Sequence, residues 1–118
     1  MKNQMHFYLR NQSSQPRGIV SFKRDGNETF MAISVCAEKD QFFKRIARSI
    51  IEGRFKKSIF MKYENGMSLK DVFQFLHQNS SPKDQKKAME NSDMLIQTNQ
   101  EMFQKQIEWF TSNGQKAA

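Results

Sequence analysis

The dipeptide Asp25-Gly26 lies between two short runs in which apolar and polar residues alternate, and it constrains the fold more than any other feature. Alternation with a period of two is typical of strands that bury one face, and Asp-Gly suits the left-handed backbone of a tight hairpin turn. The sequence therefore predicts an antiparallel hairpin with strands over residues 17–23 and 28–35. The aromatic, β-prone segment 5–10 is expected to pair beside it and complete a small antiparallel sheet.

Beyond the hairpin the apolar spacing changes from two residues to about 3.6, which indicates a basic amphipathic helix over 38–52. Its expected buried face consists of Phe42, Phe43, Ile46, Ala47, Ile50 and Ile51. Gly53 follows at the position where a residue in the left-handed conformation commonly ends a helix. Residues 58–63 are compatible with a fourth strand.

Two more helices are expected in the second half of the chain. Ser68 and Asp71 have the spacing of a capping box, so a short helix is predicted over 69–78. Pro82 suits the first turn of a helix, and a long helix is predicted over 82–112. The expected fold class is therefore α+β, with a small antiparallel sheet followed by three helices.

The long helix carries apolar pairs at steps of seven residues, namely Ala88-Met89, Leu95-Ile96, Met102-Phe103 and Trp109-Phe110. A seven-residue repeat favours packing along another helix, whereas docking onto the chain's own sheet would bury the same pairs. Both arrangements remain open. In the first, two copies form a homodimer through Leu95, Ile96, Met102, Phe103, Trp109 and Phe110. The expected organisation is a compact basic α+β domain over 1–80, the helix over 81–113, which Asn113-Gly114 ends, and a tail over 114–118.

The positive charge is concentrated in one part of the chain. Lys and Arg number 19 against 12 Asp and Glu, a net charge of +7, and residues 38–62 alone hold eight basic and three acidic side chains. Such a concentration attracts phosphate polymers, although a solvated helix face would look the same. The residues predicted to contact nucleic acid are Lys39, Lys44, Arg45, Arg48, Arg54, Lys56 and Lys57. Tyr8 or Phe22 could stack on unpaired bases if the sheet exposes them, and core packing is the alternative for both.

The sequence contains no recognisable catalytic or metal-binding motif. Its single cysteine, Cys36, and its two histidines, His6 and His77, lie far apart, and its five glycines are scattered. We therefore expect no catalytic residues, no metal and no cofactor, with a small metal-dependent nuclease as the enzymatic alternative. The lone cysteine and the lack of a long apolar run or signal-like N-terminus predict a cytoplasmic protein that does not associate with membranes.

One segment resembles known sequences. The run from Cys36 to Arg54, with Lys39-Asp40-Gln41-Phe42, then Lys44-Arg45 and Arg48, and finally Gly53-Arg54, is similar to a segment of small proteins encoded by tailed bacteriophages and related mobile elements. The resemblance covers about a sixth of the chain. It implies a phage-type origin and a short accessory protein for replication, recombination, transcription or counter-defence, which would work in the cytoplasm of a bacterial host.

Two functions remain in view. The first is non-enzymatic binding of DNA or RNA through the basic helix. The alternative is a protein-interaction module, such as a phage inhibitor of a host defence or rival-element factor, that uses the long C-terminal helix while the charge tunes association.

Overall fold

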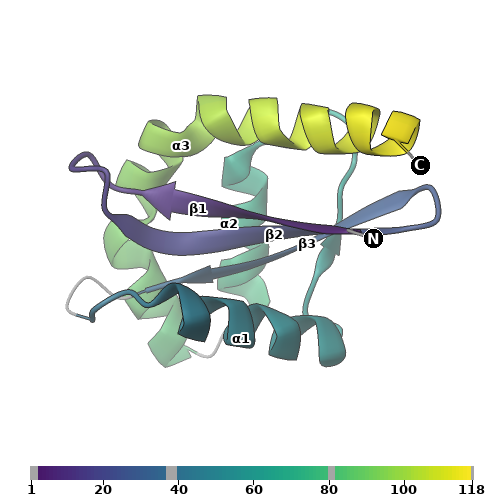
Figure 1. Cartoon of the computed structure of the whole chain (residues 1–118). Helices are drawn as coiled ribbons and strands as arrows, with labels where there is room; N and C mark the ends of the chain where they lie inside the picture. Colours follow the sequence, from purple (N-terminus) through teal and green to yellow (C-terminus); the bar gives the residue numbers. More distant parts are fainter. Residues whose placement is uncertain (1–2, 37–39, 80–81, 118) are drawn as a thin grey trace.

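A computed structural model describes the backbone of residues 3–36, 40–79 and 82–117, and the side chains of these residues outside 82–91 and 113–117. The chain forms a four-stranded antiparallel sheet and three helices, which confirms the predicted α+β class (Figure 1). In chain order the elements are β1 (Gln4–Arg10), β2 (Pro16–Asp25), β3 (Glu28–Val35), α1 (Lys44–Lys56), β4 (Met61–Lys62), α2 (Leu69–Asn79) and α3 (Pro82–Ala117).

The predicted hairpin is the centre of the sheet. Strands β2 and β3 pair in register from Asp25 opposite Glu28 to Gly18 opposite Val35, and Gly26 in the turn has a φ of 65°. The expected pairing of β1 beside β2 is also present, and the strand order is β1-β2-β3-β4. The fourth strand is much shorter than the segment 58–63: Met61 and Lys62 form it opposite β3, and the Tyr63 N–H adds a hydrogen bond to the Thr29 carbonyl at 2.7 Å.

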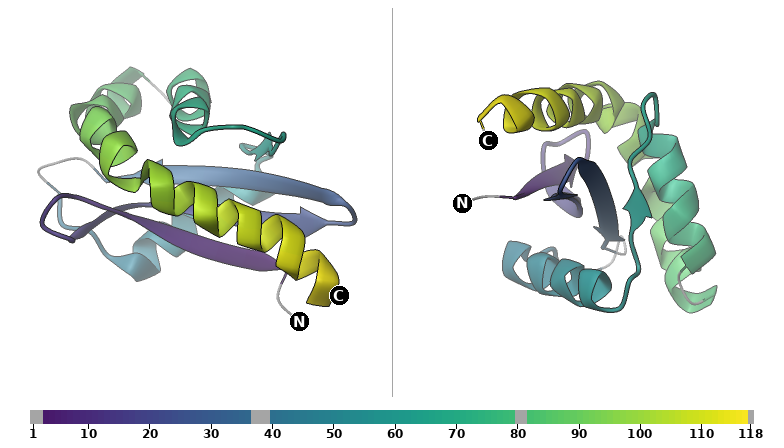
Figure 2. Two further views of the ribbon diagram at one scale, coloured as in Figure 1. Left: turned by 90° about the horizontal axis from the view of Figure 1, so that it is seen from above. Right: turned by 90° about the vertical axis from the view of Figure 1, so that its right-hand side faces the viewer.

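Helices cover both faces of the sheet, so the alternation in the strands separates two hydrophobic clusters (Figure 2). On one face, Phe22 of β2 and Met31 of β3 are fully buried under α2 and α3. On the other face, Ile19 and Ala32 pack against α1. The larger cluster lies on the α2 and α3 side, and the smaller one holds α1 against the sheet.

Helix α1 is displaced along the chain from the prediction, which is corrected at both ends. It begins at Lys44, and Gly53 lies within it and not at its end. The helix ends on Ser58, whose φ is 60°, with the Ile59 amide donating to the Arg54 carbonyl at 2.7 Å. The Ser58 amide donates to the carbonyl of Phe55, which completes a Schellman motif, so Ser58 takes the left-handed position expected of Gly53.

The apolar face predicted for α1 is only partly buried. Ala47 and Ile51 are buried against the sheet, whereas Ile46 is 55% exposed and Ile50 is 41% exposed. Phe43 stands just before the helix and is half exposed. The helical period is present, but the sheet accommodates only a narrow stripe of the face.

The short helix α2 begins as predicted. The backbone N–H of Ser68 donates to Asp71 Oδ2 at 2.8 Å, and the N–H of Asp71 donates to Ser68 Oγ at 3.3 Å. This reciprocal pair is the capping box expected from the sequence. The Ser68 backbone N–H and the Ser68 hydroxyl both donate to Asp71 Oδ2, and these two bonds lower the pKa of Asp71 below its usual value, since they favour the carboxylate form.

The long helix α3 docks onto its own sheet. Its first part lies beside α2, and after a change of direction its later part crosses the sheet next to β1 (Figures 1 and 2). Leu95, Phe103, Ile107 and Phe110 belong to the same hydrophobic cluster as the strands. The helical backbone continues through Asn113-Gly114 to Ala117, so the prediction that these two residues end the helix is wrong.

Candidate nucleic-acid interface

The predicted basic residues on and just after α1 fall into two groups. Five of them are exposed, namely Lys44, Arg45, Arg48, Lys56 and Lys57. None of the five forms an ion pair with a carboxylate of the described side chains. The outer surface of α1 therefore carries positive charge that the described part of the protein does not neutralise.

Arg54 and Lys39 do not join this surface. Arg54 is partly buried and lines a small space with Ile33 of β3 and Leu76 of α2, so it faces the interior. This corrects its assignment as a phosphate contact, because α1 continues past Gly53 and turns residue 54 towards the sheet. Lys39 lies outside the described residues.

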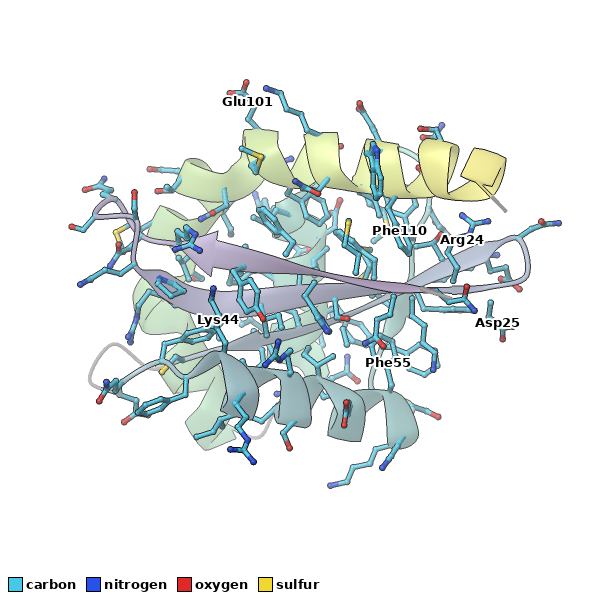
Figure 3. All side chains as sticks on the ribbon, viewed as in Figure 1. Arg24, Asp25, Lys44, Phe55, Glu101 and Phe110 are labelled. Carbon is cyan, nitrogen blue, oxygen red and sulfur yellow. The ribbon has the colours of Figure 1, made fainter. Side chains whose placement is uncertain are left out.

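The seam between α1 and the strands that it covers combines cations with aromatic rings. Lys44 Nζ lies 4.8 Å from the centre of the Tyr8 ring, and Phe42 meets the same ring edge-on at 6.2 Å. At the other end of α1, Lys23 Nζ lies 5.3 Å from the centre of the Phe55 ring. Figure 3 shows Lys44 and Phe55 near opposite ends of α1, on the side of the helix that faces the strands. Each contact holds a charged side chain along an apolar surface while its ammonium group stays near solvent.

His6 lies within this seam, and its position was missed from the sequence. Burial lowers the pKa of its imidazole, the nearby Arg48 guanidinium lowers it further, and Glu52 acts in the opposite direction. Its Nδ1 atom is buried and has no hydrogen-bond partner in the described structure. The signal available in the sequence was the alternation of β1, which places His6 on the same face as Tyr8.

The aromatic residues named from the sequence differ in accessibility. Phe22 is fully buried, with its ring centre 5.7 Å from that of Phe110 and 5.9 Å from that of Phe103, so its assignment as a stacking residue is wrong. It lies on the face that α3 covers. Tyr8 is half-buried beneath Lys44. Phe43, which was assigned to the buried face, is the exposed aromatic next to the basic residues.

The residues predicted as an oligomer interface are also divided. Leu95, Phe103 and Phe110 are enclosed in the chain's own core, and Ile96 packs against it. The burial of Leu95, Phe103 and Phe110 corrects their assignment to an interface, because a second copy could reach these three side chains only if the core opened, whereas Ile96 is only partly buried. Met102 and Trp109 remain exposed at 50% and 54%.

Other chemistry is limited among the groups that the structure describes. In that part of the chain no three His, Cys, Asp or Glu side chains lie close enough to hold a metal ion. Cys36 Sγ donates to the Asp40 carbonyl at 3.4 Å, and burial raises the pKa of this thiol. None of the described helices is both long and apolar enough to span a membrane.

Comparison of the chain with protein-family models, with curated proteins and with solved structures found no match.

Proposed function

We propose that the protein binds nucleic acid without catalysis, through the exposed basic face of α1. The observation that carries the proposal is the set of five exposed cations that have no carboxylate partner among the described side chains, beside the single acidic residue of α1, Glu52. Cations placed against backbone phosphates release condensed counterions, which gives affinity without sequence preference. The resemblance of residues 36–54 to phage-encoded segments fits an accessory protein of this kind, acting in the cytoplasm of a bacterial host.

The stability of the helix does not account for the positions of these charges. Cations stabilise the C-terminal end of a helix through its dipole and are unfavourable at the N-terminal end. Lys56 fits this rule, but Lys44 and Arg45 occupy the first turn of α1, which has no acidic residue. Their position costs some helix stability, so an anionic ligand explains them better than a solvated helix face does.

The exposed ring of Phe43 suggests which form of nucleic acid is preferred. It directly precedes Lys44, so an unpaired base can stack on it while the adjacent phosphate meets the ammonium group. A paired base inside a duplex does not offer its face in this way. We therefore expect single strands to bind more tightly than a duplex of equal length.

The test is fluorescence anisotropy of labelled single-stranded DNA, duplex DNA and RNA, titrated with the full chain at several salt concentrations. Five phosphate contacts give a log–log salt slope of about −3.5 on single strands. This slope corresponds to a loss of about 100-fold in affinity between roughly 50 and 200 mM salt. Absence of binding to all three polymers at about 50 mM salt would sink the proposal, because phosphate contacts are strong there.

Charge-reversal variants test whether α1 is the surface that binds nucleic acid. Arg45 and Lys56 are exposed and lie on the same side of α1, so the double variant Arg45→Glu/Lys56→Glu should abolish binding at about 100 mM salt without unfolding the protein. The matched control is Lys70→Glu/Lys105→Glu, which changes the net charge equally on α2 and α3 and should leave most of the affinity intact. Equal losses in the two variants would show that only net charge matters and that α1 is not the site.

The second candidate is a protein-interaction module that uses α3. It is favoured by the exposed side chains of Met102 and Trp109, since large apolar residues at a surface often mark protein contacts. It ranks lower because the other large apolar residues of the predicted interface are buried or packed against the core. Capture of one specific protein that survives nuclease treatment and is lost in Trp109→Ala would favour this function.

A further inference from the structure

Strand β1 forms an edge of the sheet, and the hydrogen-bond pattern shows which of its backbone groups face outward. In an antiparallel pair, residues alternate between bonding the neighbouring strand and pointing away from it. The Arg24 amide donates to the Asn3 carbonyl at 2.7 Å, and Asn3 precedes β1 by one residue. The odd-numbered residues therefore bond to β2, and the backbone N–H and C=O groups of Gln4, His6, Tyr8 and Arg10 point outward.

One end of this edge is closed by the protein itself. Asn99 of α3 accepts from the Arg10 N–H at 3.0 Å and donates to the Arg10 carbonyl at 2.8 Å, as a neighbouring strand would. The outward groups of Gln4, His6 and Tyr8 have no hydrogen-bond partner in the described part of the chain. Seen end-on in Figure 2, α3 and α1 lie above and below the sheet, the C-terminal end of α3 reaches out past β1 above it, and no described element lies beyond β1 within the sheet itself.

Exposed apolar side chains border the open edge on the α3 side. Gln100 and Gln104 are on the flank of α3 that faces α2, because their side chains bond to the backbone of Leu69 and Met67. Successive residues of a helix are rotated by 100° about its axis, which puts Met102 and Trp109 on the opposite flank of α3. Asn99, which bonds to Arg10 of β1, lies between the two flanks, so Met102 and Trp109 are on the flank nearer β1. Their exposure thus adjoins the unpaired edge on the same side of the molecule.

We infer that β1 pairs with β1 of a second copy of this chain, antiparallel and about a two-fold axis at His6, so that one sheet continues through both copies. A row of alternating N–H and C=O groups is complementary to itself when it is turned antiparallel, and such a two-fold contact closes on itself. Gln4 then lies opposite Tyr8 of the second copy, and the two His6 residues lie opposite each other. About six backbone hydrogen bonds form across the junction.

The positions of α1 and α3 are compatible with this two-fold pairing of β1. A two-fold axis perpendicular to the sheet puts the two α3 helices on the same face, antiparallel, with Met102 and Trp109 of both copies between them. On the other face, Lys44 and Arg48 of the two copies approach the junction. The open edge thereby lies at the dimer junction, with the exposed apolar flank of α3 beside it on one face of the sheet and the exposed cations of α1 beside it on the other.

Register-specific crosslinking in the absence of nucleic acid tests the geometry. In a Cys36→Ser background, His6→Cys places two thiols directly opposite each other, with Cα atoms about 5.5 Å apart, within the range of a disulfide. Tyr8→Cys is the matched control on the same edge, because the two copies of that residue would be about 14 Å apart. With copper–phenanthroline, His6→Cys should give a covalent dimer on a denaturing gel and Tyr8→Cys should not. Equal crosslinking of both variants, or of neither, would overturn the inference.

Sedimentation equilibrium of the full chain provides an independent measurement. We expect a concentration-dependent monomer–dimer equilibrium in the wild type, and the double variant Met102→Glu/Trp109→Glu should weaken it at least ten-fold. Lys70→Glu changes the net charge by the same amount on α2 and should leave the dimer unchanged. A monomer at every concentration, or a dimer unaffected by the two glutamates, would contradict the proposal. Neither experiment involves nucleic acid, so their failure would not touch the function proposed for α1.

Discussion

Replacement of Gly53 by alanine distinguishes the end of α1 seen in the structure from the end expected from the sequence. Gly53 lies inside the helix, and a Cβ atom built on it meets no atom within 4 Å. Glycine inside a helix is less favourable than alanine by about 0.5–1 kcal/mol, because it loses more backbone freedom on folding. Gly53→Ala should therefore stabilise the protein by about 0.5–1 kcal/mol, or raise Tm by about 2–4 °C for a chain of this size.

If Gly53 were the left-handed terminator of a helix that ends at residue 52, the sign would reverse. Alanine would then be forced into a conformation that costs about 1–2 kcal/mol. The assay is urea unfolding followed by far-UV circular dichroism, in which a higher midpoint at an unchanged m-value reports greater stability of the native state. Destabilisation by about 1 kcal/mol or more would refute the structural account of α1.

Two companion variants keep the measurement interpretable. Ser58 holds the left-handed position with a φ of 60°, so Ser58→Gly should remove strain there and be neutral or stabilising by up to about 1 kcal/mol. Gly26 has a φ of 65° in the hairpin turn, and Gly26→Ala should destabilise by about 1 kcal/mol or more. The second variant calibrates the size of a left-handed penalty in this protein.

Three further perturbations address the site and the core. Glu52→Gln removes the only carboxylate of α1. In anisotropy titrations at about 50 mM salt it should strengthen nucleic-acid binding by roughly two- to ten-fold. Unchanged or weaker binding would mean that the polymer binds elsewhere. The pKa of His6 in the folded protein is depressed, mainly by burial and then by Arg48. The imidazole therefore takes up a proton more readily in the unfolded chain, and the stability of the fold falls as the pH drops through about 6.5. In chemical denaturation from pH 7.5 to 5, His6→Gln should show a shallower loss of stability, and an identical pH profile would refute the assignment. Asn99→Ala removes three hydrogen bonds of the Asn99 side chain, two with the Arg10 backbone and one with the Leu95 carbonyl. In urea unfolding it should lower the free energy of unfolding by about 1–3 kcal/mol. The control Glu101→Ala, at an exposed position, should lower it by less than about 0.5 kcal/mol.

Features that depend on neighbouring residues alone were predictable. The Asp25-Gly26 turn and the capping box of Ser68 and Asp71 are each completed within four residues, so the contacts that define them are local in the sequence. The alternation that predicted β2 and β3 is likewise a local pattern, but it did not show which helix would cover which face of the sheet.

The candidate site was harder to predict because it depends on which side of α1 meets the sheet. The helical period groups Ile46, Ile50 and Ile51 on one side, but only Ile51 finds a buried position, since Ile19 and Ala32 offer a narrow apolar surface. The same docking turns Arg54 inward and leaves Arg45 and Lys56 exposed. Periodicity shows which residues share a face, and it does not reveal how wide the opposing surface is.

By itself the sequence determined the α+β class, the central hairpin and the location of positive charge, because these follow from local turn chemistry, residue alternation and composition. Only the tertiary structure decided that α3 docks on its own sheet, since the apolar pairs of a helix fit another helix or a sheet equally well. It also decided that Asn99 closes one end of β1 and that the outward groups of Gln4, His6 and Tyr8 stay unpaired in the described chain. Those contacts join residues distant in the sequence, and their geometry exists only once the sheet and helices have packed.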